Sequence, residues 1–217
     1  MNDFRRWLWD LLYPPRCMLC HRLMDTSEQL LCGRCHGDPE RYHPSRTVEF
    51  FEKVVISFCY EGDLRRSIHR FKFSGMQSYA QGYARWMVPD IERELEGTYD
   101  LVSWVPCSRL RRWLRGYDQA QVLAKEIALH LGASCVCTLK KVRHTPKQSQ
   151  QLDAARRRAN VLDAYEAYEP ERFSGKRILL IDDVMTTGAT LSECAKVLRL
   201  AGASKLVCAV IAARRKT

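Results

Sequence analysis

This sequence has no long apolar run. The most apolar part near its start, residues 7–12, is interrupted by Asp10 and followed by Pro14 and Pro15. A membrane span needs about 20 predominantly apolar residues, and a secretory leader needs an uninterrupted apolar core before its cleavage site. We therefore expect neither a membrane span nor secretion, which places the protein in the cytoplasm.

Two common nucleotide-binding motifs are also missing. No Gly-Lys-Thr ending marks a P-loop, and no Gly-x-Gly-x-x-Gly marks a dinucleotide-binding turn. Acidic residues are in the minority, with 25 Asp and Glu against 35 Lys and Arg and a formal net charge of +10 at pH 7. This balance favours anionic ligands such as phosphates or nucleic acid, although it does not indicate a fold.

Cysteine, by contrast, is plentiful: the chain has ten, and four of them form two Cys-x-x-Cys pairs. The pairs are Cys17 with Cys20 and Cys32 with Cys35. In a reducing compartment, clustered cysteines are better candidates for metal ligands than for disulfides, and a redox Cys-x-x-Cys normally occurs singly. Two such pairs can present four thiolates to a tetrahedral zinc ion. We expect a structural zinc in an N-terminal module, residues 1–43, which also contains an amphipathic helix at residues 3–13.

The rest of the chain, residues 44–217, alternates strand and helix patterns. Strands are expected at residues 54–60, 101–105, 135–139, 178–181 and 206–212. Helical periodicity connects several of them, and the helix at residues 120–131 ends at Gly132, the expected position of a left-handed cap. This alternation predicts an α/β domain with a parallel sheet and helices on both faces. Ligands of such sheets bind beyond the carboxyl ends of the strands.

The strand at residues 178–181 is followed by two acids and a loop of small residues. In order these are Asp182, Asp183, Thr186, Thr187, Gly188, Ala189 and Thr190. Backbone amides at a helix start, aided by threonine hydroxyls, favour a phosphate, and two carboxylates one sugar ring away can accept hydrogen bonds from a vicinal diol. The segment therefore predicts a site for ribose 5-phosphate. A plainer alternative is that Thr190 and Glu193 form a capping box for a helix at residues 190–201.

Residues 178–190 resemble the signature of type I phosphoribosyltransferases. Further motifs flank it, namely Phe71-Lys72-Phe73-x-Gly75, Val105-Pro106, Arg115-Gly116-Tyr117-Asp118-Gln119-Ala120 and Thr145-Pro146-x-Gln148. Together with the leading cysteines, they make the sequence similar, over essentially its whole length, to the ComF/GntX family of competence-associated proteins. The resemblance implies a type I phosphoribosyltransferase-like fold and a role in DNA uptake or in the use of DNA as a nutrient.

The resemblance also implies a ligand and residue roles. The ligand would be phosphoribosyl pyrophosphate bound with Mg²⁺, with Asp182 and Asp183 as catalytic residues at the ribose and the loop at 186–190 on the 5-phosphate. Contacts to pyrophosphate would come from Lys72, Pro106, Cys107, Ser108, Arg109 and Arg143. At Asp118 the family usually has Asn, and an extra carboxylate there is at odds with simple pyrophosphate binding.

Two functions stay open on the sequence alone, beside a plainer interpretation as a protein-interaction scaffold with a vestigial pocket. One is a magnesium-dependent phosphoribosyltransferase that displaces pyrophosphate from C1 of the ribose, although no residue identifies its acceptor. The other is a non-catalytic sensor of a phosphoribosyl ligand, with a basic surface and zinc module that bind single-stranded DNA or a DNA-uptake protein. Trp104, Trp113 and Tyr117 alternate with arginines, as aromatic residues do in nucleic-acid stacking platforms, but Trp104 lies in a strand pattern and is expected in the core. The sequence does not indicate an oligomeric state.

Overall fold

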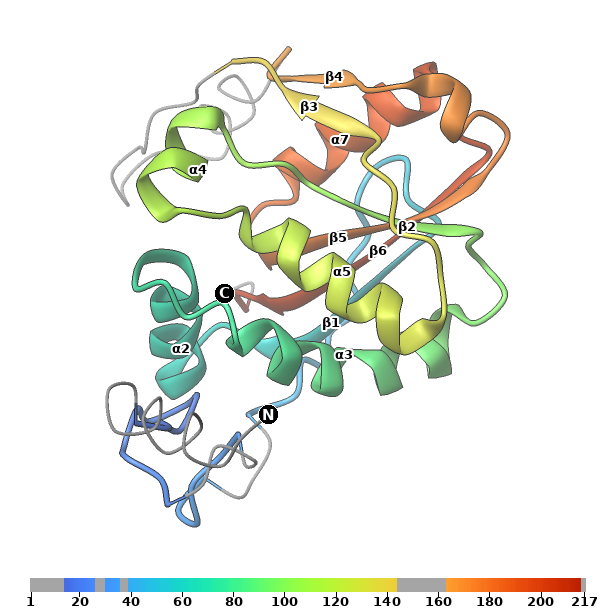
Figure 1. Cartoon of the computed structure of the whole chain (residues 1–217). Coiled ribbons are helices and arrows are strands. Elements are labelled where there is room, and N and C mark those ends of the chain that lie inside the picture. Colours follow the sequence, from blue (N-terminus) through green and yellow to red (C-terminus); the bar gives the residue numbers. More distant parts are fainter. Residues whose placement is uncertain (1–13, 26–29, 36–38, 144–162, 216–217) are drawn as a thin grey trace.

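A four-stranded parallel sheet is the centre of the computed structural model, which describes residues 14–25, 30–35, 39–143 and 163–215 (Figure 1). The strands lie in the order β1 (Lys53–Cys59), β6 (Lys205–Ala213), β5 (Arg177–Met185) and β2 (Leu101–Trp104). Every residue of β6 except the first is buried, because a parallel sheet is covered on both faces. The helix expected at residues 3–13 lies outside the described residues.

Helices cover both faces of this sheet (Figure 1). One face carries α2 (Gly62–Phe73), α3 (Tyr79–Leu95) and α5 (Gln119–Leu131), and the other carries α7 (Ala189–Leu200) with the antiparallel strands β3 (Leu139–Lys141) and β4 (Tyr165–Ala167). Successive residues of a strand point to opposite faces. Accordingly, Leu179 and Ile181 of β5 belong to the first core, and Ile178 and Leu180 belong to the second.

Most expected elements of the main domain are present, and the differences lie at residues 135–139, at α4, at β4 and at the end of β5. Gly132 ends α5 with a φ of 61°, as expected. The strand expected at residues 135–139 is wrong, since Cys135 makes only an isolated bridge to Val102 and the strand that forms, β3, pairs with β4 outside the main sheet. A short helix, α4 (Arg109–Arg115), was not expected and buries none of its residues. No helix in the described ranges has the length and apolarity needed to cross a bilayer.

Strand β5 is longer than its apolar core predicts. We expected a strand at residues 178–181 with the two acids beyond its end. In the structure β5 continues to Met185, because Asp182, Val184 and Met185 pair with residues 210, 212 and 213 of β6. Both acids therefore lie inside the strand, near its carboxyl end, and are partly buried.

Residues 17–19 of the cysteine region are buried against the main domain. Arg70, near the end of α2, donates hydrogen bonds to the carbonyl of Met18 at 3.1 Å and to that of Leu19. Gly82 on α3 leaves room for Met18, whose Sδ atom would lie 2.5 Å from a Cβ at that position. The cysteine region thus packs on α2 and α3.

Candidate functional site

The two acids of β5 lie in unequal surroundings. The Nζ atom of Lys72, near the end of α2, lies 2.7 Å from Oδ1 of Asp183, and only 21% and 13% of the two side chains are exposed. Asp182 accepts a hydrogen bond from the backbone amide of Asp183 at 2.8 Å. Burial and the neighbouring Asp183 raise the pKa of Asp182 to about 8. Near neutral pH the site therefore holds one ion-paired carboxylate and one carboxyl group that largely retains its proton.

One wall of this site joins two motifs that lie far apart in the sequence. The guanidinium of Arg115 lies 4.6 Å from the ring centroid of Phe73, and it also donates to the side chain of Gln119. The hydroxyl of Tyr117 donates to the carbonyl of Phe71. Burial lowers the pKa of Arg115, and the attraction of Asp183 opposes that shift. The Phe-Lys-Phe motif and the Arg-Gly-Tyr-Asp-Gln motif therefore hold two cations beside Asp183.

The small-residue loop ends at the start of α7 without a capping box. Gly188 is the N-cap residue, with a φ of 85° that favours glycine, and the helix begins at Ala189. Thr190 lies inside the helix, and Glu193 instead accepts a hydrogen bond from the backbone amide of Asp163 at 3.0 Å. The expected capping box is therefore wrong. Within the described ranges, the only side chain that bonds an amide here is Thr187, whose Oγ1 is 3.4 Å from the amide of Ala189. A helix start without a strong side-chain cap can bind an anion.

The expected pyrophosphate loop is organised by Asp118. Its buried carboxylate accepts hydrogen bonds from the amides of Cys107 at 2.8 Å and of Gln121 at 3.3 Å, so it caps α5 and ties the loop to it. The Ser108 hydroxyl accepts from the amide of Arg111 and caps α4. Burial and the charge of Asp118 raise the pKa of Cys107 to about 12, so this thiol is not a nucleophile at neutral pH. The Asp118 carboxylate is therefore satisfied by the protein itself.

The six residues expected at pyrophosphate do not all converge. Lys72 contacts the acid pair, Pro106 and Ser108 are buried at the turn after β2, and Arg109 and Arg143 are exposed. Of the family motifs, Thr145 to Gln148 lies outside the described residues. Among the described residues of this set, Lys72 is thus the one that contacts the acid pair.

Two residues of β3 and β4 border the site although the sequence did not single them out. Lys141 donates a hydrogen bond to the hydroxyl of Tyr165 at 3.0 Å, and its Nζ lies 4.7 Å from that ring's centroid. Burial and the nearby Arg111 lower the pKa of Lys141, while the charge of Asp182 acts in the opposite direction. In the sequence, Lys141 is only one residue of a basic stretch. Its contact with Tyr165 depends on the pairing of β3 with β4, which brings together residues that are far apart in the sequence.

Of the three aromatic residues that alternate with arginines, two are buried, and one of these, Trp104, lies in the core as expected. Trp104 is buried in β2, and Tyr117 is buried against Phe71. Trp113 alone is open to solvent, with 77% of its surface exposed on α4.

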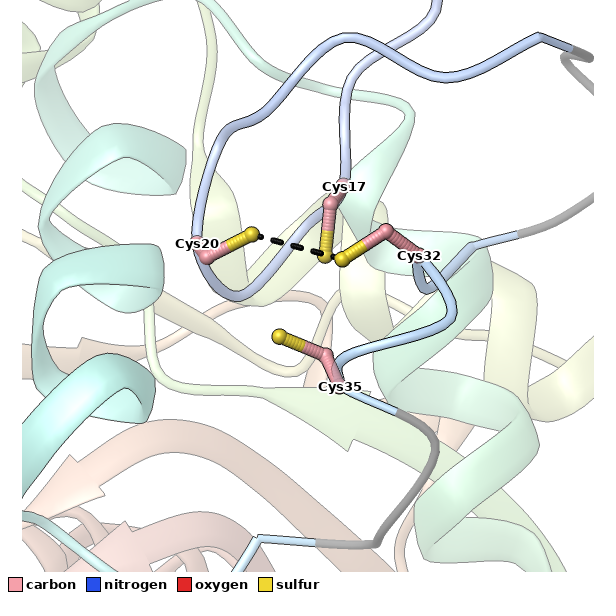
Figure 2. Close-up of side chains that lie close together, drawn as sticks. All are labelled: Cys17, Cys20, Cys32 and Cys35. Carbon is pink, nitrogen blue, oxygen red and sulfur yellow. Dashed lines mark hydrogen bonds between the residues drawn. The ribbon is translucent and has the colours of Figure 1, made fainter.

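The four cysteines of the N-terminal region converge on one point (Figure 2). Their Sγ atoms all lie within 4.8 Å of one another, and those of Cys20 and Cys32 are 3.5 Å apart. Tetrahedral zinc with Zn–S bonds of about 2.3 Å requires sulfur atoms about 3.8 Å apart. The cluster therefore fits a zinc ion held by Cys17, Cys20, Cys32 and Cys35.

Two known domain families match parts of the chain. The phosphoribosyl transferase domain matches residues 118–217, and the double zinc ribbon domain matches residues 8–46. Solved structures that resemble the chain include an allosteric regulatory enzyme of purine biosynthesis, with 22% identity and a TM-score of 0.42 over 62% of this chain and 25% of that one. A hypoxanthine phosphoribosyl transferase of Trypanosoma cruzi has 12% identity and a TM-score of 0.36 over 79% of this chain and 76% of that one. The chain thus spans about a quarter of the first of these two structures.

Several relatives match most of the chain. Competence protein F of Haemophilus influenzae is 32% identical over 187 residues, which cover 81% of each protein. The DNA utilization protein YhgH of Salmonella typhimurium is 29% identical over 196 residues, 87% of this chain and 81% of the relative. Competence protein ComFC of Bacillus subtilis is 25% identical over 186 residues, 84% of this chain and 70% of the relative.

Proposed function

The chain belongs to the ComF/GntX family of competence proteins, with a type I phosphoribosyltransferase-like domain and a cysteine module of the double zinc ribbon kind, and on this premise we propose that it binds phosphoribosyl pyrophosphate with Mg²⁺. The observation that carries the proposal is the arrangement at the carboxyl end of β5. There the pair of acids and the start of α7 follow one another along the chain, and the ammonium of Lys72, on α2, contacts Asp183. This combination suits a sugar diol next to a phosphate.

Each part of the site has a role in this proposal. The loop at 186–190 holds the 5-phosphate through its amides and hydroxyls, and Asp182 and Asp183 accept hydrogen bonds from the ribose hydroxyls. Asp182 has a raised pKa, so binding of a diol that prefers the ionised carboxylate releases the proton of Asp182. The amide of Cys107 and the hydroxyl of Ser108 are already engaged. We therefore assign pyrophosphate chiefly to Lys72 and the arginines of α4, and Mg²⁺, when bound, neutralises part of the pyrophosphate charge.

Transfer would follow from this placement. The C1–O bond breaks, pyrophosphate leaves with its electron pair, and the lone pair of an acceptor forms the new bond to C1. The ribose carries positive charge as the bond breaks, so the nearby carboxylates stabilise the transition state. In the cell, the relatives named for competence and DNA utilization support a role in DNA uptake or in the use of DNA as a nutrient.

Incubation with labelled phosphoribosyl pyrophosphate, Mg²⁺ and candidate acceptors tests this proposal. Pyrophosphate release that depends on an acceptor identifies an enzyme, and binding without release identifies a sensor. We expect Lys72→Ala to weaken binding roughly tenfold, because a charge-assisted contact contributes about 1.5–3 kcal/mol. Lys140→Ala is the control, since Lys140 forms a similar 2.9 Å ion pair with Glu166 on the exposed surface of β3. Failure of the wild-type protein to bind the ligand at all would overturn the proposal.

A second activity, binding of single-stranded DNA, is favoured by α4. The helix carries the exposed Trp113 between the exposed Leu110 and Leu114, and four of its seven residues are arginines. An aromatic ring can stack on a base while arginines contact the phosphates on either side. We propose this helix as the contact surface for the strand.

Replacement of Trp113 by alanine should weaken binding of a single-stranded oligonucleotide by roughly fivefold or more, because one stacked base is lost. Fluorescence anisotropy over a salt series provides the measurement, and the affinity should fall steeply with salt as arginine–phosphate contacts are screened. Leu200→Ala, a change at another exposed apolar residue on α7, is the control. A salt-insensitive affinity would contradict the model. Strong competition by ribose 5-phosphate, which lacks the pyrophosphate assigned to the arginines of α4, would instead place a DNA phosphate in the 186–190 loop.

A further inference from the structure

A groove of about 500 Å³ lies beside the phosphate loop. One side is formed by Thr187 to Ala189 and by the following turns of α7, and the other side is formed by residues 47–50. Because the loop itself lines one end, a ligand held by its phosphate at 186–190 has open space directly next to that phosphate. The volume lies within the range of small-molecule binding sites.

The two walls of the groove are fixed to each other. The guanidinium of Arg46 donates a hydrogen bond to the carbonyl of Thr186 at 3.0 Å. Val48 is buried, and a Cβ at Gly188 would lie 3.2 Å from its Cγ2 atom. The segment at 47–50 is therefore held against the phosphate loop, and the groove is a formed feature of the site.

Phe50 presents a partly exposed aromatic ring at this groove. The side chain is 41% exposed, and its backbone has a φ of 70°, a left-handed value that bulky residues rarely adopt. Such strain persists where the surroundings enforce it, often at ligand sites. An aromatic ring beside a phosphate site offers a surface on which a nucleobase can stack.

The charges of the groove favour an uncharged part of a ligand. Lys196 is the one basic residue among those that line the groove, which also include the acids Glu49 and Glu193. Glu193 is engaged with the amide of Asp163. A further phosphate would gain little here, whereas a nucleoside has a flat base and several polar edges. We propose that the groove binds a second nucleoside, joined by a phosphodiester to the ribose 5-phosphate in the site. The ligand class is then a dinucleotide unit, either free or at the end of a strand, and the inference rests on the proposed function.

Calorimetric titrations of the full chain with three probes test this inference. The probes are ribose 5-phosphate, adenosine 5′-monophosphate and the dinucleotide adenylyl-(3′→5′)-adenosine, which differs from the second by one nucleoside. We expect the dinucleotide to bind roughly 5- to 100-fold more tightly than the mononucleotide, as one stacked base allows. If a pentanucleotide binds as tightly as the dinucleotide, the ligand of the site is the end of a strand. If the pentanucleotide binds more weakly, the ligand is the free dinucleotide.

Two variants and a control locate the gain in affinity. Phe50→Ala removes the ring, and Ser192→Phe fills the groove from α7, so both should abolish the gain while leaving ribose 5-phosphate binding unchanged. Tyr168→Ala, at an aromatic residue that is 40% exposed just beyond β4, should keep it. If ribose 5-phosphate binds but the dinucleotide has no advantage, or the advantage survives both variants, the groove assignment alone is wrong. If no probe binds, the proposed function is wrong as well.

Discussion

Changing both Asp182 and Asp183 to asparagine should lower the affinity for ribose 5-phosphate by at least roughly tenfold while the chain stays folded. Asparagine is nearly isosteric with aspartate and removes the Asp183 carboxylate and the ionised form of Asp182 from the ribose diol. Loss of even one charged acceptor, worth about 1.5–3 kcal/mol, accounts for a tenfold effect. The fold should persist because both acids are only partly buried near the end of β5 and the apolar core of that strand is untouched. Calorimetric titration of the wild type and the variant measures the loss.

The pH dependence of the same binding gives this prediction a sharper form. Asp182 has a pKa of about 8, so its ionised fraction rises between pH 6.5 and 8.5. If the diol binds the ionised form of Asp182, wild-type affinity should rise over that range, and Asp182→Asn should flatten the curve. The phosphate of the ligand titrates near pH 6, below this range. Asp63→Asn is the control, since Asp63 is an exposed partner of Arg66 on α2. Unchanged affinity in the folded double variant would refute the role of the acids.

Gly188→Val is a poor probe of the phosphate contact. A valine side chain there would obstruct the approach of a phosphate and strain the turn. In the structure, a Cβ at Gly188 would also lie 3.2 Å from Cγ2 of the buried Val48, on top of the strained φ of 85°. The variant would therefore disturb the packing of residues 47–50, and a loss of binding would not isolate the phosphate contact.

The parts of the site that sequence predicted are those specified by local chemistry. Two acids followed by threonines and glycine have a recognisable order, and Gly132 marks a helix end because glycine readily adopts the left-handed conformation of a cap. Four cysteines at metal-ligand spacing likewise converge as expected. The first two signals depend on residues a few positions apart, and the cysteines are recognised by the spacing within each Cys-x-x-Cys pair.

The parts that sequence missed depend on contacts between distant segments. The extension of β5 to Met185 is set by pairing with β6, and the partner of Glu193 is the amide of Asp163 rather than a capping-box amide. Asp118 looked like an extra ligand-facing charge, but its carboxylate accepts the amide of Cys107, eleven residues earlier. The spacing of residues along the chain does not reveal which of these partners will meet.

Purified protein should contain about one zinc ion per chain, and Cys20→Ser should abolish it. Four thiolates complete a tetrahedral shell, and an oxygen in place of one sulfur weakens a site built for soft ligands. Metal analysis after preparation under reducing, chelator-free conditions gives the zinc content. The variant should also lose structure in residues 14–25 and 30–35 first, because bound metal supplies most of the folding free energy of so small a module.

The packing of this module decides how far the damage spreads. Met18 and Leu19 are buried against the main domain and accept hydrogen bonds from Arg70, so loss of zinc should uncover part of the apolar surfaces of α2 and α3. We expect a lower melting temperature for the main domain but a sheet that remains folded, as read by hydrogen exchange in β5 and β6. Cys135→Ser, outside the cluster, should retain the metal. Absence of zinc from the wild type would refute the metal assignment. Simultaneous unfolding of both parts in Cys20→Ser would instead show that the module and the domain, divided near residue 44, form one cooperative unit.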